Sequence, residues 1–161
     1  MSELAFLSLD ATAPAGRVRP LARSPLTRRL REVGAEFEER DGWLVAVRVP
    51  GEEERRLAIR DVTHVFAGHD WGTVPGTVPP LAGLAALEIE GSGATTVLRR
   101  ISELELDTLP AVGAVAHVRA WLFRTGEEAY RLVFEQEYGH YLWEVVVDAA
   151  EPLGGGPAGT P

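Results

Sequence analysis

Apolar side chains in the second half of the chain follow first the period of a strand and then that of a helix. Residues 111–124 and 129–134 are rich in β-branched and aromatic side chains, and the residues between them suit a turn. This pattern predicts a β-hairpin. From 135 to 149 an apolar stripe at helical spacing predicts an amphipathic helix. Its members are Tyr138, Tyr141, Leu142, Val145, Val146 and Ala149.

The first half predicts a short helix followed by a hairpin. Residues 24–34 form the helix, with Ser24 able to accept a hydrogen bond from a free amide at its start and Gly34 able to end it. The apolar face of this helix is Leu26, Leu30 and Val33. Residues 35–49 form the hairpin, because Asp41–Gly42 is a type I′ turn signal between alternating strands.

The remaining pattern completes an α+β fold with a mixed or antiparallel sheet, hairpins and about three helices. Residues 57–63 and 84–90 favour strands, and 95–106 a helix. The chain thus divides into three parts: an extended N-terminal arm at 1–22, one α+β domain at 23–153, and a flexible C-terminal tail at 154–161.

Composition narrows the possible partners and compartment. The 161 residues carry 24 acidic and 16 basic side chains, a formal charge of −8, and every basic residue is arginine. An acidic chain lacks the basic footprint of a nucleic-acid binder. No apolar run is long enough for a membrane span, no basic region precedes an apolar stretch at the N-terminus, and there is no cysteine. We therefore expect a cytoplasmic protein with no nucleic-acid or membrane partner.

Residue chemistry alone predicts no catalytic or metal site. His64, His69 and Asp70 are metal-ligand types, but their spacing matches no zinc motif. The serines lack the context of an activated nucleophile, and the acidic pairs have no nearby histidine. Gly91-Ser92-Gly93 precedes a helix and resembles a phosphate loop only weakly.

Four short segments resemble the glycine-cleavage T-protein family. Residues 23–43 match its opening pattern, with Ser-Pro-Leu, a short helix, Gly-Ala and Gly-Trp. Asp61-Val-Thr-His64 is similar to its Asp-Val-Ser-His segment, and 106–114 and 129–134 resemble two later steps of the same pattern. The nearest subgroup is the γ subunit of heterotetrameric sarcosine oxidase, whose chains correspond to the first part of the folate-binding fold.

The departures from this family indicate that the chain does not catalyse aminomethyl transfer by itself. Where the family has a tyrosine, this chain has His117, and the family's Gly-Gly-x-x-Asp-Asp turn is shortened to 124–128 with no aspartate. The resemblance covers only the first part of the fold. No residue is carried over as catalytic.

The resemblance implies a non-catalytic small subunit that stabilises a flavin-dependent sarcosine oxidase-like complex of one-carbon metabolism, a heterotetramer. FAD, FMN, NAD and tetrahydrofolate would belong to larger flavin- and folate-binding partner chains, with no cofactor in this chain. Aromatic side chains would suit the interface, although Trp121 and Trp143 could equally fill the core. The aromatic residues considered are Trp71, Trp121, Tyr138, Tyr141 and Trp143.

The alternative is a stand-alone module that binds a folate-like ligand in a vestigial pocket. Its candidate residues are His117, Arg119 and Trp121, which strand alternation places on one face. Arg119 could bind a carboxylate of the folate tail through a bidentate contact. A buried, hydrogen-bonded His117 is the simpler alternative for that residue.

Overall fold

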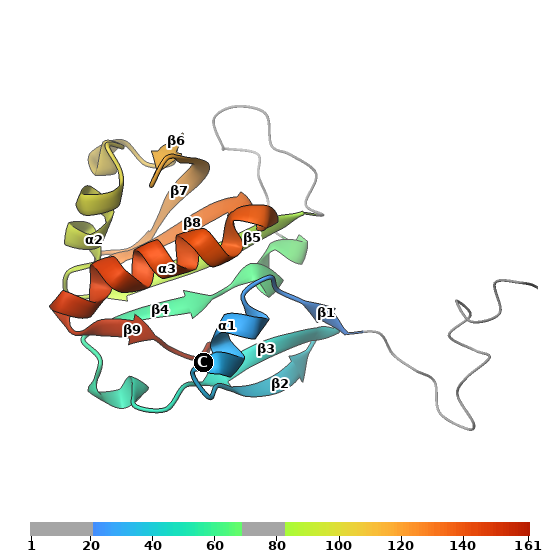
Figure 1. Ribbon diagram of the computed structural model, residues 1–161. Coiled ribbons are helices and arrows are strands. Elements are labelled where there is room, and N and C mark those ends of the chain that lie inside the picture. Colours follow the sequence, from blue (N-terminus) through green and yellow to red (C-terminus); the bar gives the residue numbers. More distant parts are fainter. Residues whose placement is uncertain (1–20, 69–82) are drawn as a thin grey trace, which may run out of the picture.

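The computed structural model describes residues 21–68 and 83–161 and shows an α+β fold with two sheets (Figure 1). The smaller sheet has the strand order β1 (Ala22–Arg23), β3 (Trp43–Arg48), β2 (Glu36–Arg40). The larger sheet has the order β6 (Ala111–Val115), β7 (Val118–Gly126), β8 (Ala129–Glu135), β5 (Leu84–Gly91), β4 (Leu57–Asp61), β9 (Gly155–Pro157). The predicted fold class is confirmed.

Three α-helices and several 3₁₀ turns connect the strands. The α-helices are α1 (Thr27–Glu32), α2 (Ala94–Ile101) and α3 (Gly139–Ala150). The 3₁₀ turns are η2 (Glu52–Glu54), η3 (Thr63–Gly68), η4 (Leu106–Thr108), η5 (Gln136–Tyr138) and η6 (Glu151–Leu153). None of the helices in the described part of the chain is long and apolar enough to span a bilayer.

The first helix and hairpin form in the predicted places, but the helix is shorter than the expected 24–34 and begins at Thr27. The Ser24 hydroxyl accepts a hydrogen bond from the Leu26 amide (3.1 Å) in the turn that precedes α1. Asp41 and Gly42 both have positive φ (50° and 82°), as a type I′ turn requires. Leu26 and Leu30 are fully buried, but Val33, expected on the same face, is 41 % exposed.

The main core lies between the larger sheet and α2 and α3, which cover one of its faces (Figure 1). The sheet contributes fully buried side chains such as Leu87, Leu122 and Phe134. Helix α3 adds Leu142, Trp143, Val146 and Ala150 to the buried set. The predicted stripe was therefore right for Leu142 and Val146 and wrong for Tyr138 and Tyr141, which face outward.

The predicted single strand at 111–124 is in fact two strands joined by a tight turn. Ala116 and His117 have φ of 46° and 67°, and they reverse the chain between β6 and β7. The sequence prediction failed because neither residue is a usual choice for a left-handed turn. His117 consequently lies in a turn and not inside a strand.

The C-terminal segment 154–161, expected to be a flexible tail, is built into the fold. Strand β9 pairs in parallel with β4, which places Gly155 opposite Leu57. The following residues reach the smaller sheet, where the Thr160 amide donates to the Ala46 carbonyl (2.8 Å). The segment was missed because its glycine-rich sequence shows no period, whereas backbone hydrogen bonds hold it in place. The N-terminal arm lies outside the described residues, apart from 21–22.

Candidate functional site

The structure separates the three residues predicted to form one pocket. Arg119 and Trp121 lie on the face of the larger sheet opposite α2 and α3, with the Arg119 guanidinium 5.5 Å from the Trp121 ring centroid. Trp121 is only 3 % exposed and packs with Val62, Leu84, Ala86 and Val133. His117 is exposed in the β6–β7 turn, and it lines a hollow on the helix side. A pocket shared by all three is therefore not formed.

The hollow beside His117 has a volume of about 790 Å³. It lies between the C-terminal end of α2, the β6–β7 turn and the outer side of α3. This volume is in the range of small-molecule sites. Its polar lining includes Arg99, Arg100, His117 and Tyr141, together with one acidic side chain, Glu103.

Hydrogen bonds fix the walls of this hollow relative to one another. The Ala116 amide donates to the Ile101 carbonyl at the end of α2 (2.6 Å). On the other side, the Tyr141 hydroxyl donates to the Ala116 carbonyl (3.0 Å). The Ser102 hydroxyl also donates to the Ala114 carbonyl (3.1 Å). The turn is thus bonded to both helices, and the opening between them is preformed.

A second polar group lies inside the protein, where β4 ends near α1. The Asp61 carboxylate accepts hydrogen bonds from the Thr63 amide (3.1 Å) and hydroxyl (2.7 Å). The Thr63 hydroxyl also lies 3.2 Å from the Ser24 hydroxyl and accepts a bond from the Ala86 amide (3.1 Å). Ser24, Asp61 and Thr63 are buried, so this cluster connects α1, β4 and β5 through polar contacts.

Burial is the largest influence on the pKa of Asp61 and on that of the neighbouring His64. It raises the pKa of the Asp61 carboxyl, against the opposing effect of the Thr63 and Ser24 hydrogen bonds and of His64. Burial also lowers the pKa of His64, while the neighbouring Asp61 charge acts in the opposite direction. Because the hydroxyls already occupy the carboxylate, the arrangement supports the fold more directly than it supports proton transfer to a ligand.

Two weaker candidates from the sequence do not gain support. Within 21–68 and 83–161, no group of three metal-ligand side chains comes together; His69 and Asp70 lie outside these residues. Gly91 and Gly93 have a packing role, since a Cβ at Gly91 would lie 2.3 Å from the Arg56 carbonyl oxygen and one at Gly93 would lie 3.3 Å from the Leu153 side chain.

The aromatic residues proposed for an interface divide into two groups. Trp121 and Trp143 are buried, which supports the alternative that they fill the protein's own interior. Tyr138 and Tyr141 are 40 % and 44 % exposed. Trp71 lies outside the described residues.

Sequence reasoning missed two features of these sites. Arg99 and Arg100 are adjacent at the end of α2, and the adjacency was visible in the sequence. The Asp61-x-Thr63 spacing was also visible, because short polar side chains two residues apart commonly bond locally. The proximity of Thr63 to Ser24, and of Arg99 and Arg100 to the β6–β7 turn, depends on tertiary structure.

The comparisons with known proteins give only distant similarities. No family model matches the chain, and no curated protein matches it. Similar solved structures include heterotetrameric sarcosine oxidase from Corynebacterium sp. U-96 in complex with pyrrole 2-carboxylate, at 24 % identity and a TM-score of 0.43. The match covers 52 % of this chain and 46 % of that chain.

A second similar structure is the glycine cleavage system aminomethyltransferase T from Bartonella henselae, at 16 % identity and a TM-score of 0.36. It covers 81 % of this chain and 36 % of that chain. The chain therefore spans about half of the first structure's chain and about a third of the second's. At these TM-scores and identities, neither likeness establishes a family or a function for this chain.

Proposed function

We propose that this chain is a non-catalytic small subunit of a heteromeric, flavin-dependent sarcosine oxidase-like amine oxidase or N-demethylase. In this proposal FAD, FMN, NAD and tetrahydrofolate belong to the larger subunits, and this chain stabilises the assembly. The sequence motifs between residues 23 and 150 suggest the family. The structural observation that carries the proposal is an exposed pair of tyrosines at the start of α3.

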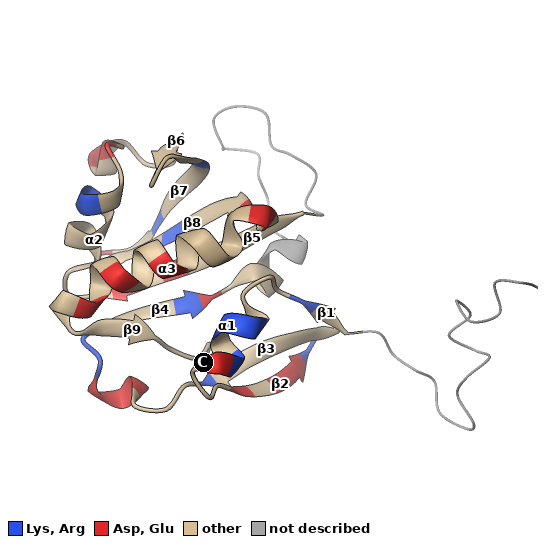
Figure 2. Ribbon diagram, in the orientation of Figure 1, with Lys and Arg blue, Asp and Glu red and all other residues tan. Residues whose placement is uncertain are grey.

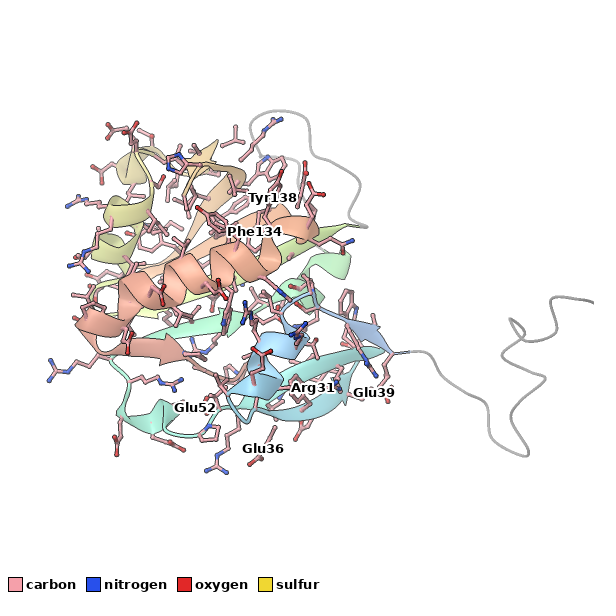
Figure 3. The ribbon with its side chains drawn as sticks, in the orientation of Figure 1. Arg31, Glu36, Glu39, Glu52, Phe134 and Tyr138 are labelled. Carbon is pink, nitrogen blue, oxygen red and sulfur yellow. The ribbon has the colours of Figure 1, made fainter. Side chains whose placement is uncertain are left out.

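Tyr138 ends η5, immediately before α3, and is labelled in Figure 3. Tyr141 lies three residues later, in the first turn of α3. Residues spaced by three on a helix are neighbours on its surface. Large exposed aromatic side chains are frequent anchors of protein interfaces, because they bury much area at a small entropy cost. We define these two tyrosines as the α3 aromatic pair.

The charge around the pair suggests the character of the partner surface. Figure 2 colours acidic positions along α3 red, and the sequence of this helix contains Glu144 and Asp148. Both are exposed, although Glu144 already forms an ion pair with Arg29, and the exposed Glu137 precedes Tyr138. A complementary partner would present apolar pockets for the tyrosine rings, with arginine or lysine side chains around them. A larger subunit with a basic rim fits this description.

The proposal is tested by isolating the tagged chain from its host and recording absorbance from about 350 to 500 nm, where bound flavin absorbs. Larger chains that co-purify with a flavin spectrum, and whose flavin is bleached by sarcosine or a related secondary or tertiary amine, are the expected result. A colourless 17.5 kDa species would contradict the proposal.

Two variants make this test specific to α3. Tyr138→Ser removes one ring of the aromatic pair, and we expect recovery of the flavin-containing chains to fall by about tenfold or more. Val33→Ser is the matched control, because Val33 is a similarly exposed apolar side chain outside α3, at the end of α1. Equal recovery with both variants would show that α3 is not the docking surface.

The alternative of a stand-alone folate-binding module loses its predicted pocket, because His117 lies apart from Arg119 and Trp121. That alternative would require tetrahydrofolate to bind the isolated chain elsewhere. Titration of the purified chain with tetrahydrofolate, followed by fluorescence of the tryptophans, distinguishes the two functions. The subunit proposal predicts no saturable change.

A further inference from the structure

We propose that the hollow between α2, the β6–β7 turn and α3 is a binding site for a small organic anion, in which a carboxylate or phosphate group is joined to an apolar body. The arginines at the end of α2 would bind the anionic group. This inference does not depend on the proposed subunit role, because it concerns a different kind of ligand; the two sites share one residue, Tyr141.

Two arginines at the hollow have no acidic partner within the described part of the chain. Other arginines of the described residues do pair with a glutamate, as Arg28 does with Glu32 and Arg131 with Glu88. Arg99 and Arg100 have no carboxylate of the described residues within ion-pair distance. Two guanidinium groups without a carboxylate partner therefore line one hollow of a chain whose formal charge is −8.

Contacts within the protein occupy the arginines only in part. Arg100 donates one long hydrogen bond to the Ala149 carbonyl (3.4 Å). Both residues lie in the last turn of α2, where a cation stabilises the negative end of the helix dipole. A guanidinium has five N–H donors, so most donors of this pair stay available for a ligand.

The rest of the lining favours an organic ligand over a bare ion. Ile101, Leu104 and Val145 contribute aliphatic surface. His117 and Tyr141 contribute rings and further polar atoms at the side formed by the turn and α3. An anion with an apolar body would use both parts of this lining, with its charged group at the arginines.

The backbone around the hollow is prearranged for binding. The Ala116 amide and carbonyl bond to α2 and α3 respectively, so the turn that carries His117 is held on both sides. A site that is already ordered loses little entropy when a ligand enters. Glu103 is the one acidic residue of the lining, and it would select against ligands with several negative charges.

The test is a titration of the full chain with benzoate and with phenyl phosphate, followed by amide chemical shifts in NMR. Benzamide is the neutral control ligand. Saturable shifts at 101–104 and 114–117 are expected for at least one anion. The anion that binds more tightly identifies whether the site prefers a carboxylate or a phosphate group. Benzamide should bind about tenfold more weakly, because it lacks the charge-assisted hydrogen bonds.

Charge-matched variants separate local binding from general electrostatics. Arg99→Gln with Arg100→Gln should weaken anion binding by about tenfold or more. Arg28→Gln with Arg31→Gln removes the same charge from the exposed side of α1 and should leave binding unchanged. Val145→Trp keeps every charge but fills the hollow, and it should also abolish binding.

The proposal is overturned by any of three results. The first is the absence of saturable shifts around the hollow with either anion. The second is equal weakening by the two double-arginine variants, which would indicate non-specific attraction. The third is unchanged binding in the Val145→Trp protein, provided that its NMR spectrum shows a folded chain. None of these results affects the flavin co-purification test, which uses Tyr138.

Discussion

Replacing Glu52 by glutamine tests how the C-terminal segment is held in the fold. One oxygen of this carboxylate accepts the Val49 amide (3.1 Å) and the Gly159 amide (2.6 Å). It therefore joins η2 to a segment more than a hundred residues later, and Figure 3 labels Glu52 near the smaller sheet. Glutamine keeps the shape and one acceptor oxygen but removes the charge.

The expected loss follows from the difference between charged and neutral hydrogen bonds. A bond to a charged group contributes about 1.5–3 kcal/mol and a neutral one about 0.5–1.5 kcal/mol. For two bonds to a half-buried oxygen, we expect the free energy of unfolding to fall by about 2 kcal/mol. In a domain of this size such a loss lowers Tm by roughly 4–8 °C.

The assay is urea and thermal unfolding followed by circular dichroism, with hydrogen exchange of the Gly159 amide as a local measurement. Glu53→Gln is the matched control, since Glu53 is an adjacent exposed glutamate that only approaches Arg48 (3.7 Å). This control should change stability by less than about 0.5 kcal/mol. Equal stability of the two variants, with unchanged exchange at Gly159, would refute the anchoring role of Glu52.

Three further changes test other parts of the structure. Burial raises the pKa of Asp61, so the stability that this carboxyl contributes is complete below its unfolded pKa and is lost as the pH rises through its folded pKa. The stability of Asp61→Asn relative to wild type, measured by urea unfolding between about pH 4 and 8, should therefore increase with pH, and a constant difference would contradict this. Ala116→Asn with His117→Gly matches the left-handed turn and should raise the free energy of unfolding by about 0.5–1 kcal/mol; a lower Tm would show that the original side chains matter more than the turn. Tyr130→Phe removes a buried hydroxyl that hydrogen-bonds to Thr95 and Arg124 (both 2.8 Å). The free energy of unfolding measured in urea should fall by about 1–3 kcal/mol, whereas an unchanged value would indicate that water replaces the tyrosine hydroxyl.

Local sequence signals predicted the fold where one residue type determines the backbone. Asp41–Gly42 predicted the first hairpin because these residues accept positive φ easily. The turn at Ala116–His117 has similar backbone angles without the usual residues, so only the tertiary bonds of Ala116 explain it. The strand at 155–157 was missed for a related reason, since pairing with β4 and not hydrophobic period defines it.

The candidate sites were less predictable because they combine distant segments. Strand alternation placed Arg119 with Trp121 correctly, and their cation–π contact agrees with it. The same alternation was extended through His117, where the chain in fact turns, so His117 was assigned to the wrong surface. The hollow joins the end of α2 to α3, a proximity that no local pattern indicates.

The most direct test of the proposed function is the mass and flavin content of the species that contains this chain in its host. The subunit proposal predicts a heteromeric complex, probed by native mass spectrometry, in which this 17.5 kDa chain accompanies larger flavin-containing chains. It also predicts that addition of sarcosine or a related amine bleaches the flavin of that complex. Isolation of the chain alone, or with partners that contain no flavin, would contradict the account.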